Sequence, residues 1–218
     1  MYFWISLLLF MGICASQNNQ ANNKPHERMM LRAIQSQAKC SCGKVHLSID
    51  SPSALRMVVY SKDYRGYYRS LNEIAKEQGK PQVAPIDPFG GIDLIQIYPS
   101  EIQVTKGADL IETVLIREGS PIRRSYSTCC DTPLFDIGNA AMLNSDLLKE
   151  EEKPEVEFRI IGRHSLKGDG TIPKPAISWS LPWNWAFTMF KRMDSSKKEP
   201  APVDLSNKPT IMRNFKEG

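Results

Sequence analysis

Two close pairs of cysteines, far apart in the chain, constrain the fold more than any other feature of the sequence. Cys40 and Cys42 lie in KCSCGKV, and Cys129 and Cys130 lie in STCCDTP. Thiolates on two tight turns can converge tetrahedrally on one zinc ion, which then staples distant strands together. We therefore predict a zinc site with Cys40, Cys42, Cys129 and Cys130 as its ligands.

Two other states of the same cysteines stay open at this point. In an oxidising compartment the four residues could form disulfides, and in a reducing one adjacent buried thiols could be inert. A bond between Cys129 and Cys130 themselves would be strained. Neighbouring α-carbons lie about 3.8 Å apart, which is below the usual range for a disulfide.

The hydrophobic pattern indicates a mainly β fold with one short inserted helix. Residues 44–50 alternate, with Val45, Leu47 and Ile49 on one face, as in a half-buried strand. The pattern continues over 55–60 and then changes to a helical period over 70–79, where Ser70 and Glu73 resemble a capping box. Further β-rich runs, mostly antiparallel by their short connections, follow at 94–97, 102–104, 112–117, 122–127 and 155–161.

The ends of the chain differ in composition from its middle. Residues 2–14 form an apolar run that is too short to span a bilayer, which takes about 20 residues, and suits a signal peptide or anchor over 1–16. The alternative is that translation begins at Met29 or Met30, which would make residues 1–28 an extension and the protein cytoplasmic. Otherwise we expect the secretory pathway or a membrane tether through 2–14. We assign 17–36 to a polar linker, 37–190 to the zinc domain and 191–218 to a flexible basic tail.

The charge distribution argues against nucleic acid as a partner. The chain of 218 residues has 28 basic and 24 acidic side chains, a formal charge of +4. Residues 37–190 hold 18 basic and 19 acidic residues, so the expected domain has no basic excess. Binding to a phosphate backbone needs such an excess.

The cysteine motifs resemble those of the glutathione-dependent formaldehyde-activating enzyme and centromere protein V family. The resemblance rests on Cys40, Cys42, Gly43 and Val45 entering a strand, and later on Arg124, Tyr126, Cys130, Thr132, Pro133 and Leu134. Residues 87–139 look closer to an uncharacterised branch in which adjacent cysteines precede Thr-Pro. The resemblance implies a zinc-stapled tent of antiparallel sheets, and a small thiol such as glutathione as a partner.

The departures from the family pattern decide the expected function. The family has Cys-x-x-Cys where this chain has Ser127 and Cys130, so Cys129 would replace the missing ligand. Three further cysteines bind the catalytic zinc of the family, and Val59, Ser61 and Tyr64 stand at the matching positions. None of these can bind and acidify a thiol as a metal does.

We therefore expect no catalytic residues, and a zinc-binding domain that acts as a binding or scaffolding module. The alternative is a carbon–sulfur lyase that acts on glutathione adducts through unconventional residues near 59–65. The side chains of Lys62, Asp63, Arg65, Tyr67 and Tyr68 could line a remnant pocket for an anionic ligand, or form a solvated turn.

Overall fold

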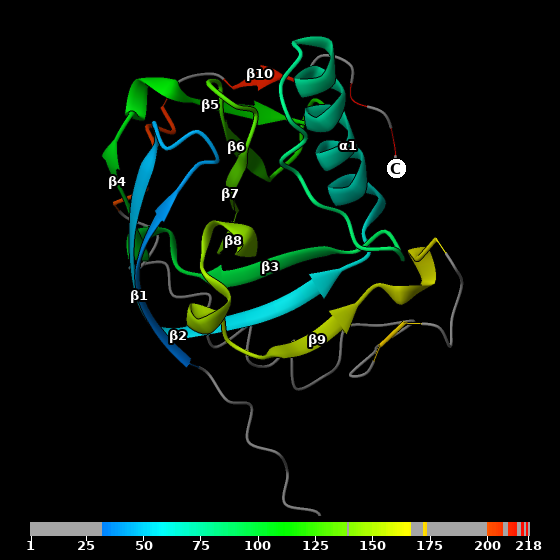
Figure 1. Cartoon of the computed structure of the whole chain (residues 1–218), viewed down its shortest axis with the longest axis horizontal. Coiled ribbons are helices and arrows are strands. Elements are labelled where there is room, and N and C mark those ends of the chain that lie inside the picture. The colour runs from blue at the N-terminus through cyan, green and yellow to red at the C-terminus, as the bar shows by residue number, and fades with distance from the viewer. Residues whose placement is uncertain are drawn as a thin grey trace, which may run out of the picture.

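The computed structural model describes residues 32–138, 140–166, 172–173, 200–206, 209–212, 215 and 217. They form a ten-stranded sheet in the order β1-β2-β3-β8-β7-β6-β5-β10, with β4 and β9 also paired to β2, together with helices and connecting loops (Figure 1). The strands are β1 (Arg32–Lys39), β2 (His46–Val59), β3 (Ile92–Ile97), β4 (Ile102–Lys106), β5 (Ile111–Leu115), β6 (Arg123–Ser127), β7 (Pro133–Ile137), β8 (Ala141–Asn144), β9 (Val156–Ile160) and β10 (Thr210–Ile211).

The long strand β2 joins two parts of the sheet. Its first part pairs with β1 and β4, and its last part, residues 55–59, pairs with β3 and β9. The pairs β2–β9 and β5–β10 are parallel, while the other pairs are antiparallel. The expected mainly β fold is thus confirmed, and most of the strand pairs are antiparallel as expected, although the two parallel pairs make the sheet mixed. Both parallel partners return to the sheet after long connections, as parallel pairing requires.

The single α-helix of the described residues, α1, spans Lys62–Glu77. The prediction placed its start at residue 70 and was wrong, because Tyr64, Tyr67, Tyr68 and Leu71 recur at helical spacing and are buried on one face. Ser70 therefore lies inside the helix, where its hydroxyl donates to the carbonyl of Gly66 at 3.0 Å. The segment that could have been a solvated turn is the first half of α1.

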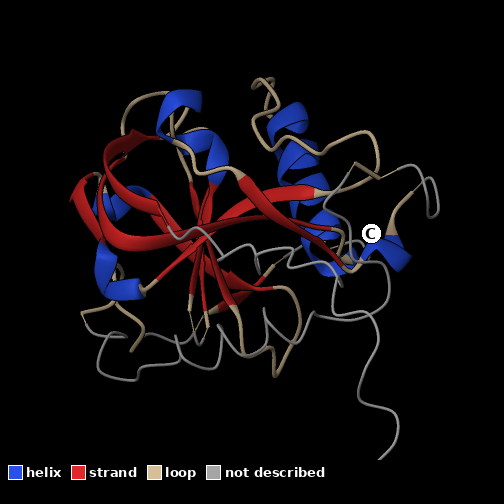
Figure 2. Ribbon diagram, turned by 90° about the horizontal axis from the view of Figure 1, so that it is seen from below, coloured by secondary structure: helices blue, strands red, loops and turns tan. Residues whose placement is uncertain are grey.

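Two hydrophobic clusters lie on opposite faces of β3. Ile95 and Ile97 belong to the first cluster, with the first part of β2 and with Cys40 and Cys130. Ile92 and Leu94 belong to the second, which contains the buried tyrosines of α1. Figure 2 shows the twisted strands with α1 on one side of them. The alternation of side chains along a strand thus divides the core into a cysteine side and a helix side.

Several elements lie where the sequence analysis expected none. β1 begins at Arg32, inside the segment 17–36 assigned to a linker, and β10 lies within the expected tail 191–218. The sequence analysis did not predict β7 and β8. Short 3₁₀ helices connect the strands: η1 (Pro99–Glu101), η2 (Ala108–Leu110), η3 (Ser145–Leu147), η4 (Glu150–Glu152) and η5 (Gly162–His164).

Two sequence predictions cannot be compared with the fold. The apolar run 2–14 and the possible start sites Met29 and Met30 lie outside the described residues. Within the described ranges, no helix is both long and apolar enough to cross a membrane.

Candidate metal centre and adjoining pocket

The turn between β1 and β2 presents the first cysteine pair. The amide of Gly43 donates to the carbonyl of Cys40 at 2.8 Å, and the amide of Cys40 donates to the carbonyl of Val45 at 3.1 Å. Gly43 has φ +70°, a conformation that a residue with a side chain rarely adopts. This tight turn buries Cys40 and leaves Cys42 exposed.

The loop between β6 and β7 presents the second pair. The amide of Ser127 donates to the carbonyl of Thr132 at 2.9 Å, and the amide of Asp131 donates to the carbonyl of Ser127 at 2.8 Å. Asp131 has φ +55°, and its buried carboxylate accepts from Lys80 Nζ at 3.0 Å. Closed in this way, the loop places Cys129 and Cys130 side by side.

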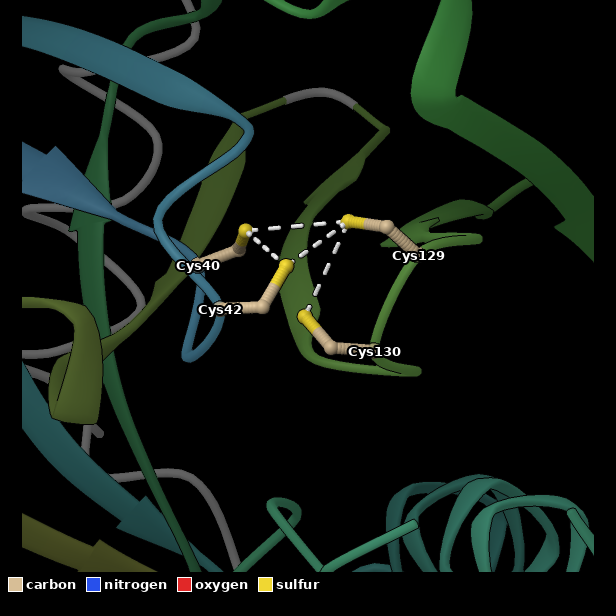
Figure 3. Close-up of side chains that lie close together, drawn as sticks. All are labelled: Cys40, Cys42, Cys129 and Cys130. Atoms are coloured by element: carbon tan, nitrogen blue, oxygen red, sulfur yellow. Dashed lines mark hydrogen bonds between the residues drawn. The ribbon is translucent and has the colours of Figure 1, made fainter.

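The four thiols converge although Cys40 and Cys129 lie 89 residues apart in the sequence. Their sulfur atoms all lie within 4.8 Å of one another, and Figure 3 shows them directed toward a common centre. The Sγ of Cys42 lies 3.2 Å from that of Cys129, and the Sγ of Cys40 lies 3.6 Å from that of Cys42. Cys129 Sγ lies 3.9 Å from both Cys40 Sγ and Cys130 Sγ. All four are free thiols.

These separations suit a tetrahedral metal site. Zinc–thiolate bonds of about 2.3 Å place the sulfur atoms of a tetrahedron about 3.8 Å apart. The four cysteines could therefore hold a metal ion after small side-chain adjustments. A set of four protein thiolates leaves no coordination position for a substrate, which is typical of structural rather than catalytic zinc.

Hydroxyl groups surround the buried member of the second pair. Ser127 Oγ and Thr132 Oγ1 each lie 3.1 Å from Cys130 Sγ. Burial raises the pKa of the Cys130 thiol, but hydrogen bonds from these hydroxyls and from Ser41 outweigh it and lower that pKa to about 5. Burial, and then the neighbouring Cys42 thiol, raise the pKa of Cys129 to about 12. The hydroxyls thus stabilise one thiolate, and a bound cation would favour the thiolate form of the others.

Ser127, which stands where the resemblance has a cysteine, lies beside the cluster as a hydrogen-bond partner. Its hydroxyl contacts Cys130 and accepts from the amide of Thr132 at 3.2 Å. Thr132 Oγ1 also lies 3.0 Å from Ser41 Oγ, and this contact joins the two loops. Cys129, not Ser127, completes the group of four.

Val59, Ser61 and Tyr64 lie apart from these thiols, at the junction of β2 and α1. All three line a pocket of about 660 Å³. Asp63 lines it as well, but Lys62, Arg65, Tyr67 and Tyr68 do not. The Arg65 guanidinium is buried and donates to the carbonyl of His164 at 2.9 Å.

The floor of this pocket is a row of side chains across four strands. Gln96 of β3 pairs with Met142 of β8, Met142 with Asp136 of β7, and Asp136 with Arg124 of β6. Residues that pair directly across antiparallel strands point to the same face of the sheet. The row therefore places one amide and one pair of opposite charges on the helix side of the sheet.

The two charges of the row bind each other. Arg124 Nη1 lies 2.7 Å from Asp136 Oδ2, and both side chains are buried. The guanidinium also stacks on Tyr64, 4.2 Å from the ring centre, and lies 5.2 Å from that of Tyr67. Burial is the main cause that raises the pKa of Tyr64, and the negative charge of Asp136 raises it further. The phenol therefore stays neutral. The ion pair thereby connects β6 and β7 to the first turn of α1.

Sequence reasoning missed Gln96 and Asp136. The available signal was a lone polar residue inside an apolar strand, as in LIQI at 94–97 and LFDI at 134–137. A polar side chain at such a position is buried and needs a partner. Arg124 was noticed only as part of the family resemblance.

Comparison with known sequences identifies no relative. No family of known proteins matches the chain, and no curated protein matches its sequence. Among solved structures, a Rhodobacter sphaeroides protein studied by structural genomics is similar with a TM-score of 0.33 and 11% identity. The alignment covers 53% of this chain and 89% of that one, and a likeness this distant carries no argument about function.

Proposed function

We propose that the chain is a zinc-binding module in which Cys40, Cys42, Cys129 and Cys130 hold one structural Zn²⁺. The observation that carries the proposal is the convergence of four sulfur atoms within 4.8 Å from two separate loops. Zinc prefers soft thiolate ligands in this geometry. The ion would fix the β1–β2 turn to the β6–β7 loop.

In this proposal the module binds a ligand without lyase activity. The side chains at the positions of the family's catalytic ligands, Val59, Ser61 and Tyr64, supply no thiolate to a second metal ion. They line a pocket instead, and a pocket whose side chains at these positions offer no thiolate ligand suits binding rather than metal-assisted thiol activation.

A carbon–sulfur lyase that acts on glutathione adducts is the alternative, and the pocket at Val59 and Tyr64 is the observation that favours it. A turnover assay with glutathione and formaldehyde separates the two functions. The binding module predicts no rate above the uncatalysed reaction, and a lyase predicts saturable turnover and a second zinc ion in the chain.

Elemental analysis combined with native mass spectrometry under reducing conditions tests the zinc site. We expect one zinc ion for each wild-type chain. Of its five thiols, the four of the site should react with a thiol reagent only after chelation. Cys129→Ser removes one ligand and should weaken zinc binding at least tenfold. Thr128→Ser is the matched control, because this exposed neighbour keeps its hydroxyl, and it should retain zinc. Wild-type protein that contains no zinc and in which the four thiols of the site react without chelation would refute the proposal.

A further inference from the structure

The amide of Gln96 lacks the hydrogen bonds that a buried amide needs. The side chain is fully buried, and neither its Nε2 nor its Oε1 has a partner among the described residues. A primary amide can donate two hydrogen bonds and accept two. Buried polar groups are nearly always paired, and an unpaired one lowers stability. Because Gln96 lines the pocket, a molecule bound there is the partner in reach.

The rest of the pocket is largely apolar. Met57 and Val59 of β2, Met142 of β8 and Ile160 of β9 line it, and Leu205 reaches it from the C-terminal segment. Its volume of about 660 Å³ lies within the usual range for small-molecule sites, about 300–1,000 Å³. Binding of an apolar molecule to such a surface is favourable, because it removes apolar area of both from water.

The charged side chains around the pocket already have partners within the protein. Arg124 pairs with Asp136 on the floor, and Asp63 pairs with Arg117 at the surface. Arg123 Nη1 donates to the carbonyl of Leu205 at 2.6 Å. A charged ligand would have to break one of these pairs or bury an uncompensated charge, which is costly. One further donor, Nε of the ion-paired Arg124 guanidinium, is buried and has no hydrogen-bond partner among the described residues.

We propose that this pocket binds a small, uncharged, mainly apolar molecule that carries an amide, or an equivalent donor and acceptor side by side, and that Gln96 recognises that group. The inference rests on the proposed role as a binding module and specifies its ligand. It also replaces the anionic ligand considered from the sequence, because Lys62 and Arg65 do not line the pocket.

Three probes of nearly equal size test the inference: 4-ethylbenzamide, 4-ethylbenzoate and the hydrocarbon 1-ethyl-4-isopropylbenzene. NMR titration of the full chain gives the dissociation constant of each. We expect the carboxamide to bind at least tenfold more tightly than the carboxylate or the hydrocarbon. A hydrogen-bonded polar group in a buried site is worth about that factor.

Two variants connect the selectivity to Gln96. Gln96→Met keeps the length of the side chain and removes the amide, so the carboxamide should lose about tenfold in affinity and bind like the hydrocarbon. Gln103→Met on β4 makes the same substitution at an exposed position outside the pocket and should keep the preference. Unchanged selectivity in Gln96→Met, tighter binding of the carboxylate, or no saturable binding of any probe would overturn the inference.

Zinc is counted in the same samples, so the two proposals can fail separately. Carboxamide selectivity in a protein without zinc would refute the metal site and keep the ligand class. One zinc ion in a protein that does not prefer the carboxamide would support the metal site and refute the ligand class.

Discussion

Gln96 is a polar residue at a position where the alternation of β3 demands an apolar one. Its neighbours on the same face, Ile92 and Leu94, pack in the second hydrophobic cluster. An unpaired amide there lowers the stability of the unliganded protein. A polar residue that lowers stability in the floor of a pocket departs from the apolar pattern of the strand, and such departures are expected at functional sites.

Replacing Gln96 with methionine should therefore stabilise the unliganded protein. We expect Gln96→Met to raise the free energy of unfolding by about 1–2 kcal/mol, because it removes an unsatisfied amide and keeps the apolar volume. Urea denaturation measures the change. Gln103→Met on β4 is the matched control, since Gln103 is exposed, and it should leave the stability unchanged. A loss of stability in Gln96→Met would mean that the amide already has a partner.

Among single residues, the sequence predicted the four cysteines as a group and pointed to part of the pocket near Val59 and Tyr64, but it did not predict Gln96 and Asp136. Cysteines in two close pairs carry their chemistry in their spacing, and the structure does bring them together. Gln96 and Asp136 have no such spacing, because their proximity arises from the pairing of β3, β8 and β7. Strand order is not encoded in any local pattern of residues, so this row could not be predicted.

Among the elements, the β6–β7 hairpin links the two sites. Its loop carries Cys129 and Cys130, and its strands carry Arg124 and Asp136. The register that pairs Arg124 with Asp136 includes an irregularity between Ser125 and Tyr126. A metal ion held at the loop would stabilise this register, and through it the floor of the pocket.

A double-mutant cycle on this hairpin measures the ion pair. Arg124→Met and Asp136→Leu should each lower the free energy of unfolding by about 3–5 kcal/mol, since each leaves one buried charge without its partner. The double variant should be much more stable than the sum of the two losses predicts. Arg117→Met, which breaks the exposed pair with Asp63, should have no measurable effect. Additive losses would indicate that the two charges do not interact.

The sequence predicted the boundaries of an element well only where the hydrophobic period was clear. The runs expected at 112–117 and 122–127 correspond to β5 and β6, which pair as expected. The start of α1 was missed because Lys62, Asp63 and three tyrosines suggest a turn by composition. Their spacing of three and four residues was the better guide, since it places Tyr64, Tyr67 and Tyr68 on one buried face.

Across the whole molecule, the C-terminal segment contributes to the core despite its basic, proline-rich composition. β10 pairs in parallel with β5, and the amide of Met212 donates to the carbonyl of Leu115 at 2.8 Å. Met212 is buried in the second cluster, while Val203 and Leu205 pack against the first. Composition alone did not predict this packing, because the apolar residues are isolated among polar ones and prolines.

Two neighbouring substitutions decide whether this segment supports the fold in solution. Met212→Ala should lower the free energy of unfolding by about 2 kcal/mol, because it leaves a cavity between α1 and the sheet. Ile211→Ala alters the adjacent residue of β10, whose side chain is 48% exposed, and should change stability by less than about 0.5 kcal/mol. Thermal and urea denaturation of the full chain provide both values. If both substitutions change the free energy of unfolding by less than about 0.5 kcal/mol, the segment is a loosely held tail, as its composition suggests. Leu205 would then not line the pocket in solution.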